Sequence, residues 1–381
     1  MPRSSTDARN KTPRPTAGSR IGRRSFLKTS AAITGGALVA SRLGTARAAA
    51  KELTIFTWET YHDDPWIAEY TAKTGVKVNV VRTGSVDEMF AQTSSGAVQA
   101  DIIYFDTSSV PRYINAGLIA PLDDSKLKNT GNITKQLDYH KLLTIDGKLW
   151  GVPYNWGTQP LMFNAEQVTP APDSWGALWD PKYKGKVNMF DDAFITFPMI
   201  ALYAGAKNAY QLTDAEFENC RKALRDLRPQ VRTIARGFDD AQTIYAAGDG
   251  VIGYCQNISI VWNLKAKNLP FAYSFPKEGT PTWIDCAILS KAGAEKQEAY
   301  DFIDANLDRA WQGRFITASI NNGILSAAEA KAAGIPEDVL AKTNIIDQDA
   351  SGFWDKMSVL QPPEDIDKRV EIWNEFKAGT L

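Results

Sequence analysis

The sequence predicts an α/β protein whose sheets are built largely from parallel strands. Short runs rich in apolar and β-branched residues alternate with stretches of helical periodicity along most of the chain. This alternation is typical of strands joined by crossover helices. A leader-like N-terminus is followed by about 330 residues. This length is more than a single hydrophobic core usually serves, so two domains are favoured.

The first 48 residues are predicted to be an export signal and not part of the fold. Arg23 and Arg24 precede Ser-Phe-Leu-Lys, an uncharged run at 29–41 and the triplet Ala-Arg-Ala that ends at Ala48. A basic start, a short apolar run and small residues at the cleavage site define a secretory leader. The paired arginines indicate the twin-arginine route. A membrane anchor needs about 20 mostly apolar residues, so we expect cleavage after Ala48, with Ala50 as the alternative.

Removal of this leader changes the charge of the protein. The whole chain has a net charge of -1, but residues 1–48 hold ten Lys or Arg and a single acid, so the remainder has a net charge of -10. An acidic surface argues against nucleic acid and anionic lipid as partners and is compatible with a cationic ligand.

The cysteines and histidines indicate neither a disulfide framework nor a metal site. The three cysteines are Cys220, Cys255 and Cys286, and the odd count favours buried free thiols in a protein that folds before export. A later Cys255–Cys286 pair is the alternative. The two histidines, His62 and His140, have no zinc-ligand spacing. We expect no cofactor and no metal.

The elements of the first part of the mature chain follow from composition and periodicity. Strands are predicted at 52–58, 76–81 and 101–105, where β-branched and other apolar residues gather. Helices are predicted at 62–74, 85–95 and 110–116. Gly75 and Gly117 end two of these helices, and Ser85 is positioned to cap the third.

The character of the sequence changes at Leu149. An aromatic, glycine-punctuated run at 150–157 predicts a crossover strand. Further strands are predicted at 186–190 and 251–254, and helices after Asp173 or Ser174 and at 214–227, 298–305 and 366–376. Two helical stripes predict core packing: Phe217, Cys220, Leu224 and Leu227 in one helix, and Ile366, Val370, Trp373 and Phe376 in the other.

Motifs of the common enzyme classes are missing from the sequence. It contains no phosphate-binding loop, dinucleotide fingerprint or G-x-S-x-G elbow. A hydrolase triad would need His62 or His140, and neither has a recognisable setting. The adjacent acids at 191–192 and 239–240 would point to opposite faces of a strand, so they are poor candidates for a catalytic carboxylate pair. The protein is therefore not expected to be an enzyme, and a secreted hydrolase with cleft carboxylates is the enzymatic alternative.

Four segments resemble a known family. They are Ile-Phe-Thr-Trp-Glu-Thr-Tyr at 55–61, Thr-Gly-Val-Lys-Val at 74–78, Ala-Gly-Leu-Ile at 116–119 with Pro-Leu-Asp at 121–123, and Ser-Trp-Gly-Ala-Leu-Trp-Asp-Pro-Lys-Tyr-Lys-Gly-Lys at 174–186. Their order and spacing resemble those of the periplasmic substrate-binding proteins of ABC transporters, in particular the spermidine/putrescine receptors. The last segment is the most specific.

The resemblance implies the two-lobed periplasmic binding protein fold of type II, with a ligand cleft between the lobes at the hinge. Lobe 1 would comprise 51–155 plus 284–324, and lobe 2 would comprise 156–283 plus 325–381. The implied partners are a small-molecule amine and the membrane permease of an ABC transporter. A monomer in the periplasm is expected.

The expected cleft has to hold a desolvated amine. A buried ammonium needs carboxylates at its ends, and its methylenes suit aromatic faces. The resemblance assigns this role to Trp58, Glu59, Tyr61, Asp106, Ser108, Asp192, Gln256, Trp283 and Asp285. The closest match is the Trp-x-Asp of the family, which would lay Trp283 along the alkyl chain and bind an ammonium with Asp285.

Several of these positions depart from the family pattern and leave alternatives open. Glu59 stands one place earlier than the acid of the family, and its alternative role is an ordinary solvated acid. Asp106 and Ser108 replace a serine and an aromatic residue of the family, and the alternative role for either is a helix cap. Gln256 replaces a tryptophan, so a ligand shorter or more polar than spermidine is expected. Arg236 is the alternative carboxylate anchor for a 4-aminobutyrate-like ligand. If Arg236 lies on the surface, a diamine such as putrescine is favoured.

Overall fold

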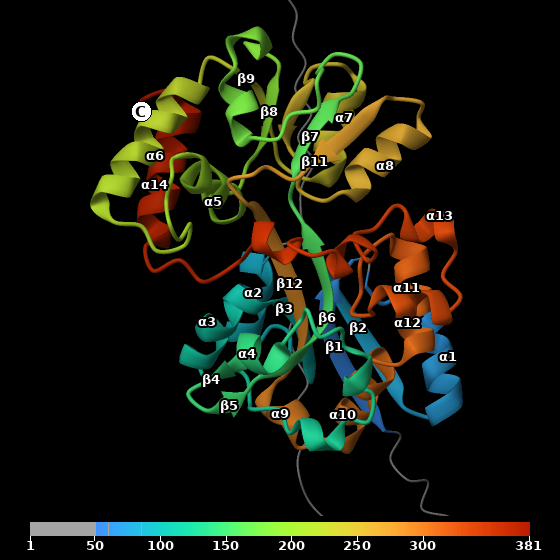
Figure 1. Cartoon of the computed structure of the whole chain (residues 1–381). Coiled ribbons are helices and arrows are strands. Elements are labelled where there is room, and N and C mark those ends of the chain that lie inside the picture. The colour runs from blue at the N-terminus through green and yellow to red at the C-terminus, as the bar shows by residue number, and fades with distance from the viewer. Residues whose placement is uncertain (1–50, 60, 85) are drawn as a thin grey trace, which may run out of the picture. The chain divides into compact units, whose positions relative to one another are not determined.

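The computed structural model describes residues 51–381 except Thr60 and Ser85. The expected leader, with its cleavage site after Ala48 or Ala50, and the expected cap at Ser85 lie outside the described residues. The described part is α/β, as the sequence predicts, with two main sheets (Figure 1). The antiparallel strands β6 (Gly151–Thr158) and β12 (Thr280–Leu289) run between them.

The first sheet has the order β13-β12-β3-β1-β2, and β6 pairs with β12. Its first three strands, β1 (Glu52–Trp58), β2 (Lys77–Thr83) and β3 (Ile102–Asp106), are parallel, and β2 and β13 (Met357–Val359) lie at the two edges. The helices that follow its strands or pack on it are α1 (Asp64–Thr74), α2 (Val86–Ser94), α3 (Val110–Asn115), α4 (Tyr139–Leu143), α9 (Lys291–Ala294), α10 (Gln297–Asn306), α11 (Arg309–Ser319), α12 (Ala327–Ala332) and α13 (Glu337–Leu340). A small hairpin of β4 (Thr144–Ile145) and β5 (Lys148–Leu149) precedes β6.

Side chains of this sheet alternate between two cores because successive strand residues point to opposite faces. Ile102 and Tyr104 pack with helices α1, α10 and α11, whereas Ile103 and Phe105 pack with Met89 of α2 and with α3. The sheet is therefore covered by helices on both faces, which explains the nearly continuous apolar runs in its strands.

The second sheet has the order β11-β7-β10-β8-β9. Its strands are β7 (Leu161–Asn164), β8 (Val187–Phe190), β9 (Val231–Ala235), β10 (Ile252–Tyr254) and β11 (Phe271–Ser274). Its helices are α5 (Ala193–Tyr203), α6 (Asp214–Leu227), α7 (Phe238–Ala246), α8 (Ser259–Ala266) and the C-terminal α14 (Ile366–Ala378). The expected helix after residue 174 is a short 3-10 helix that Ser174 caps.

The chain returns to the second sheet later than the sequence analysis expects. Leu325, Leu340, Ile345 and Phe353 pack in the hydrophobic core of the first sheet, whereas residues 325–381 were expected in lobe 2. The strand β13 pairs with β12 at Thr280–Thr282, and α14 then packs in the core of the second sheet. The physical reason is that these apolar side chains complete the core formed with α11, which sequence spacing does not reveal.

Close packing at the hinge requires glycine at position 157. Gly157 lies opposite Trp283 in the β6–β12 ladder. A Cβ added at Gly157 would lie 2.3 Å from Cζ2 of Trp283, well inside van der Waals contact. The absence of a side chain at this position therefore allows the indole ring to pack directly against β6.

The three cysteines are buried free thiols, as expected, and Cys255 and Cys286 lie in different apolar clusters. Within residues 51–381, apart from the two positions left undescribed, no helix has the length and apolar character needed to cross a membrane.

Candidate ligand-binding site

Three polar side chains form a row across neighbouring strands next to the hinge. β12 lies between β3 and β6, and Asp285 is directly opposite Asp106 on one side and Asn155 on the other. Residues opposite each other in antiparallel strands point to the same face of the sheet. The fold thus brings together two of the predicted site residues, Asp106 and Asp285, with Asn155, which the sequence analysis did not identify.

Asp285 is a buried carboxyl group for which the structure records no salt bridge among the described residues. It is 6% exposed and accepts a hydrogen bond from the hydroxyl of Tyr61. Burial raises the pKa of Asp285 to about 8, and the charge of Asp106 acts in the same direction. The hydroxyl of Tyr61 and the indole of Trp58 lower this pKa by a smaller amount. Without a ligand, Asp285 is therefore mostly protonated at neutral pH.

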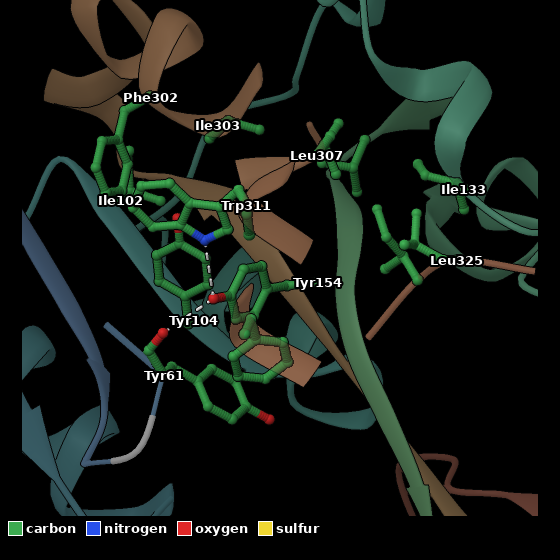
Figure 2. Close-up of a cluster of buried hydrophobic side chains, with 14 of the residues drawn as sticks. Tyr61, Ile102, Tyr104, Ile133, Tyr154, Phe302, Ile303, Leu307, Trp311 and Leu325 are labelled. Carbon is green, nitrogen blue, oxygen red and sulfur yellow. Dashed lines mark hydrogen bonds between the residues drawn. The ribbon is translucent and has the colours of Figure 1, made fainter. Parts of the chain in front are cut away.

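Tyr61 is held in place from several directions. Nδ2 of Asn155 donates to the Tyr61 hydroxyl at 3.1 Å. The backbone oxygen of Tyr61 accepts from the Tyr154 hydroxyl at 3.0 Å, and that hydroxyl accepts from Nε1 of Trp311 at 3.3 Å (Figure 2). Burial raises the pKa of Tyr61 well above its ordinary value, so its hydroxyl keeps the proton that it donates to Asp285.

His62 fixes the turn between β1 and α1 on which Tyr61 lies. Its Nδ1 accepts from the Thr57 hydroxyl at 3.0 Å and its Nε2 donates to Oδ1 of Asn306 at 2.9 Å. Burial lowers the pKa of His62 to about 3, so the ring is neutral. A fully buried neutral ring with both nitrogens engaged is a structural residue and has no free position for catalysis.

Asp106 and Ser108 take the helix-capping arrangement that the sequence analysis gave as the alternative. Asp106 accepts from the backbone nitrogen of Ser109 at 3.2 Å, from the Ser109 hydroxyl at 2.7 Å and from the Ser108 hydroxyl. All three donors come from the short helix that Asp106 begins. A direct contact of Asp106 or Ser108 with ligand stays a prediction.

The two tryptophans predicted to line the site lie on different strands of the first sheet, Trp283 on β12 with Asp285 and Trp58 at the end of β1. Trp283 is half-buried against Gly157 and contacts the core of the second sheet. Trp58 is half-buried at the end of β1, and its indole lies close enough to Asp285 to lower the pKa of that carboxyl. Its neighbour Glu59 is exposed, which agrees with a solvated acid.

Asp192, a predicted site residue of the second sheet, also lies at the end of a strand. Asp192 follows β8 and caps α5, where its Oδ1 accepts from the backbone nitrogens of Phe194 at 2.8 Å and Ile195 at 2.9 Å. Burial raises the pKa of Asp192, and the charge of Asp87 on α2 contributes in the same direction. The charge of Asp87, on a helix that packs on the first sheet, therefore acts on a carboxyl at the end of a strand of the second sheet.

Gln256 and Arg236 differ in their surroundings. Gln256 follows β10, and its buried Oε1 has no hydrogen-bond partner among the described residues. Arg236 follows β9 and is exposed, and its backbone nitrogen donates to Asp240 at 2.8 Å. The arrangement of Arg236 corresponds to the surface alternative and does not provide a buried carboxylate anchor.

Asn155 has a geometric role that the sequence conceals. Its side chain accepts from the backbone nitrogen of Gly323 at 2.8 Å while it donates to Tyr61. The one signal in the sequence is a polar residue inside the aromatic run at 150–157, and its importance appears only with the register of β6 against β12. No group of three or more His, Cys, Asp or Glu side chains suited to a metal ion occurs in the described regions.

Comparison with characterised proteins gives a consistent assignment. Residues 65–339 match the family model described as bacterial extracellular solute-binding protein. The chain is 27% identical over 293 residues to the putrescine-binding periplasmic protein SpuD of Pseudomonas aeruginosa, a match that covers 73% of this chain and 79% of SpuD. It is 28% identical over 260 residues to the spermidine/putrescine-binding periplasmic protein of Escherichia coli, covering 66% of this chain and 71% of that protein.

The solved structures agree at the level of the fold. The spermidine/putrescine ABC transporter substrate-binding protein PotD of Streptococcus pneumoniae superposes with a TM-score of 0.72 at 20% identity, covering 87% of this chain and all of PotD. The described part thus has the type II periplasmic binding protein fold that the resemblance implied. From the match over most of its length, the chain belongs to the bacterial extracellular solute-binding protein family.

Proposed function

We propose that the protein is the periplasmic substrate-binding component of an ABC importer for a small amine of the polyamine type. The observation that carries this proposal is the buried carboxyl of Asp285, which has no cationic partner among the described residues and lies between Asp106 and Asn155. A buried carboxylate is costly unless a cation compensates its charge. An ammonium group is such a cation, and the relatives named above bind putrescine or spermidine.

The proposed binding mode uses both sheets. One ammonium displaces the proton of Asp285, and the methylenes lie along Trp283 and beside Trp58. At the other end, Asp192 keeps an oxygen that makes no capping hydrogen bond to α5. The ligand therefore contacts both lobes only when they approach each other, which shifts the protein toward the closed state. The protein binds and delivers its ligand, and it is not an enzyme.

The identity of the ligand follows from the same residues. Ser108 and Gln256 stand where the family has aromatic side chains, so the aromatic walls are shorter than those that enclose spermidine. Arg236 is exposed and does not favour a 4-aminobutyrate-like ligand. Putrescine is therefore the leading candidate.

The surrounding biology is proposed from sequence and packing. The twin-arginine leader would deliver the folded protein to the periplasm, where it would work as a monomer with a membrane permease. We place residues 324–353 in lobe 1, because they share its core, and α14 in lobe 2.

A thermal-shift titration of the mature protein with putrescine and spermidine tests this function. Either ligand should raise the melting temperature, and Asp285→Ala should abolish the shift. Glu371→Ala is the matched control because Glu371 is an exposed acid on the outer face of α14. The absence of any shift with both amines at millimolar concentration would overturn the polyamine assignment.

A further inference from the structure

A cavity lies away from the row of Asp106, Asp285 and Asn155. It has a volume of about 380 Å³, which is within the range of small-molecule sites. One wall is formed by α8 and β11, and the other by Leu340, Ala341, Thr343, Ile346 and Asp347, at the end of α13 and beyond it. Figure 1 shows α8 and α13 on the same side of the hinge strands.

The two walls of this cavity belong to different cores. Leu264 of α8 packs with the second sheet, whereas Leu340 and Ile345 pack with the first. A hydrogen bond of 3.2 Å from Nδ2 of Asn344 to the Tyr273 hydroxyl joins the walls. A molecule bound in the cavity would therefore contact both halves of the fold.

The cavity lies behind the hinge relative to the amine site. Oδ1 of Asn344 accepts from the hydroxyl of Thr158 on β6 at 2.9 Å. Successive residues of a strand point to opposite faces, so Thr158 and Trp156 face away from Asn155 and Gly157. Asn155 lies beside Asp285, and Thr158 leads to the cavity. One ladder thus separates the two sites.

The side chains lining the cavity carry opposite charges on opposite walls. Lys265 projects from α8 with its ammonium 4.3 Å from the ring centre of Trp262 and has no ion pair within the described residues. Asp347 is on the other wall, where it accepts a hydrogen bond from Nδ2 of Asn344 at 3.2 Å. Trp262, Tyr273 and Ile346 supply apolar surface between them, and Ile346 is 47% exposed at this place.

We propose that this cavity is a second binding site, for a small zwitterion with an apolar body, such as a free amino acid. Its carboxylate would pair with Lys265 and its ammonium with Asp347, while its side chain covers Ile346 and the ring of Trp262. Occupancy joins the two walls and so changes the free energy of lobe movement. Amine affinity and amino-acid affinity are therefore coupled, and the coupling is reciprocal.

Calorimetric titration of the mature protein with L-leucine tests the proposal. Binding is expected for the parent protein, and Lys265→Gln and Asp347→Asn should each weaken it by about tenfold or more. Lys267→Gln and Glu337→Gln are the matched controls, because these exposed residues do not line the cavity and should leave leucine binding unchanged. Titration of putrescine with and without saturating leucine should give different dissociation constants.

The result also separates the second site from the amine site. Asp285→Ala should abolish putrescine binding and leave leucine binding intact, and leucine binding should persist even if no amine binds at all. Lack of leucine binding at millimolar concentration would overturn the second site. So would binding that Lys265→Gln and Asp347→Asn leave unchanged, or binding that Asp285→Ala removes. Equal putrescine affinity with and without leucine would overturn the coupling.

Discussion

Asp285 on β12 and Asp106 on β3 lie directly opposite each other in an antiparallel pair, and both are about 6% exposed. Their hydrogen bonding is unequal. Asp106 accepts three hydrogen bonds from the short helix that follows it, whereas Asp285 accepts one from Tyr61. Because two adjacent buried carboxylates repel each other, the less satisfied one holds a proton. The ligand-free protein therefore carries a site that an ammonium group can occupy by exchanging with a proton.

Replacing Asp285 with Asn should stabilise the ligand-free protein while it abolishes amine binding. The pKa of Asp285 is raised by burial to about 8, so the unfolded chain releases this proton as the pH rises from about 4, but the native protein keeps it until about 8. The free energy of unfolding therefore falls across this interval, and Asp285→Asn removes that fall. Chemical denaturation should show a gain on the order of 1–3 kcal/mol near pH 8 and little gain near pH 4.

The two properties of Asp285→Asn are measured independently. A variant that loses amine binding and is also less stable near pH 8 would contradict the protonated site. Asp285→Ala serves as the comparison, because it removes the carboxyl group but leaves a cavity.

Putrescine binding should release close to one proton near neutral pH. The ammonium requires ionised Asp285, whose pKa in the empty site is about 8, so affinity should rise with pH by up to about tenfold per unit and level off above about 8. Calorimetry in two buffers of different ionisation enthalpy measures the number of protons released. Identical binding enthalpies in both buffers would show that Asp285 is already ionised before the ligand arrives.

Much of the fold is readable from the sequence because its strands and helices follow simple periods. The strand at 52–58 and the helix at 214–227 have the predicted bounds, and all four residues of the stripe in α6 are buried. In α14 the prediction was wrong in part, because Ile366 and Val370 are exposed. Arg369 is buried there instead, with hydrogen bonds to Asp365 at 2.9 Å and to the backbone oxygen of Ala209 at 2.8 Å. Apolar periodicity does not detect a buried arginine that binds an acid one helical turn earlier and a backbone oxygen far away in the sequence.

The candidate site was predictable only in part, for a different reason. The resemblance identified Asp106 and Asp285 as candidates, but it is the register of β3 against β12 that places them directly opposite each other. Asn155 joins them through a second register, which includes a bulge between Asp285 and Cys286. Such pairings between distant segments have no signature in the sequence of either strand.

His62 should make the protein sensitive to acid. Burial lowers its pKa to about 3, whereas a histidine in the unfolded chain titrates near 6.5. Between these values the unfolded state binds a proton that the native state excludes, so the free energy of unfolding falls as the pH decreases, by up to about 1.4 kcal/mol per pH unit. His62→Gln should be less stable at neutral pH and lose less stability on acidification. The free energy of unfolding of the parent protein and of His62→Gln can be measured by denaturation between about pH 3 and 6.5. An equal decline in both proteins would show that His62 is not responsible.

Replacing Gly157 with Ala should affect the hinge and the amine site together. The new Cβ would lie 2.3 Å from Trp283 and would push the indole ring off β6. Overpacking of this kind costs about 1–3 kcal/mol, measurable by denaturation. Because Trp283 is predicted to line the amine, putrescine affinity should fall as well. Gly131→Ala is the matched control, since nothing lies within 4 Å of a Cβ at that position. If Gly157→Ala lowered stability but left putrescine affinity unchanged, Trp283 would be a packing residue of the hinge and not a wall of the site.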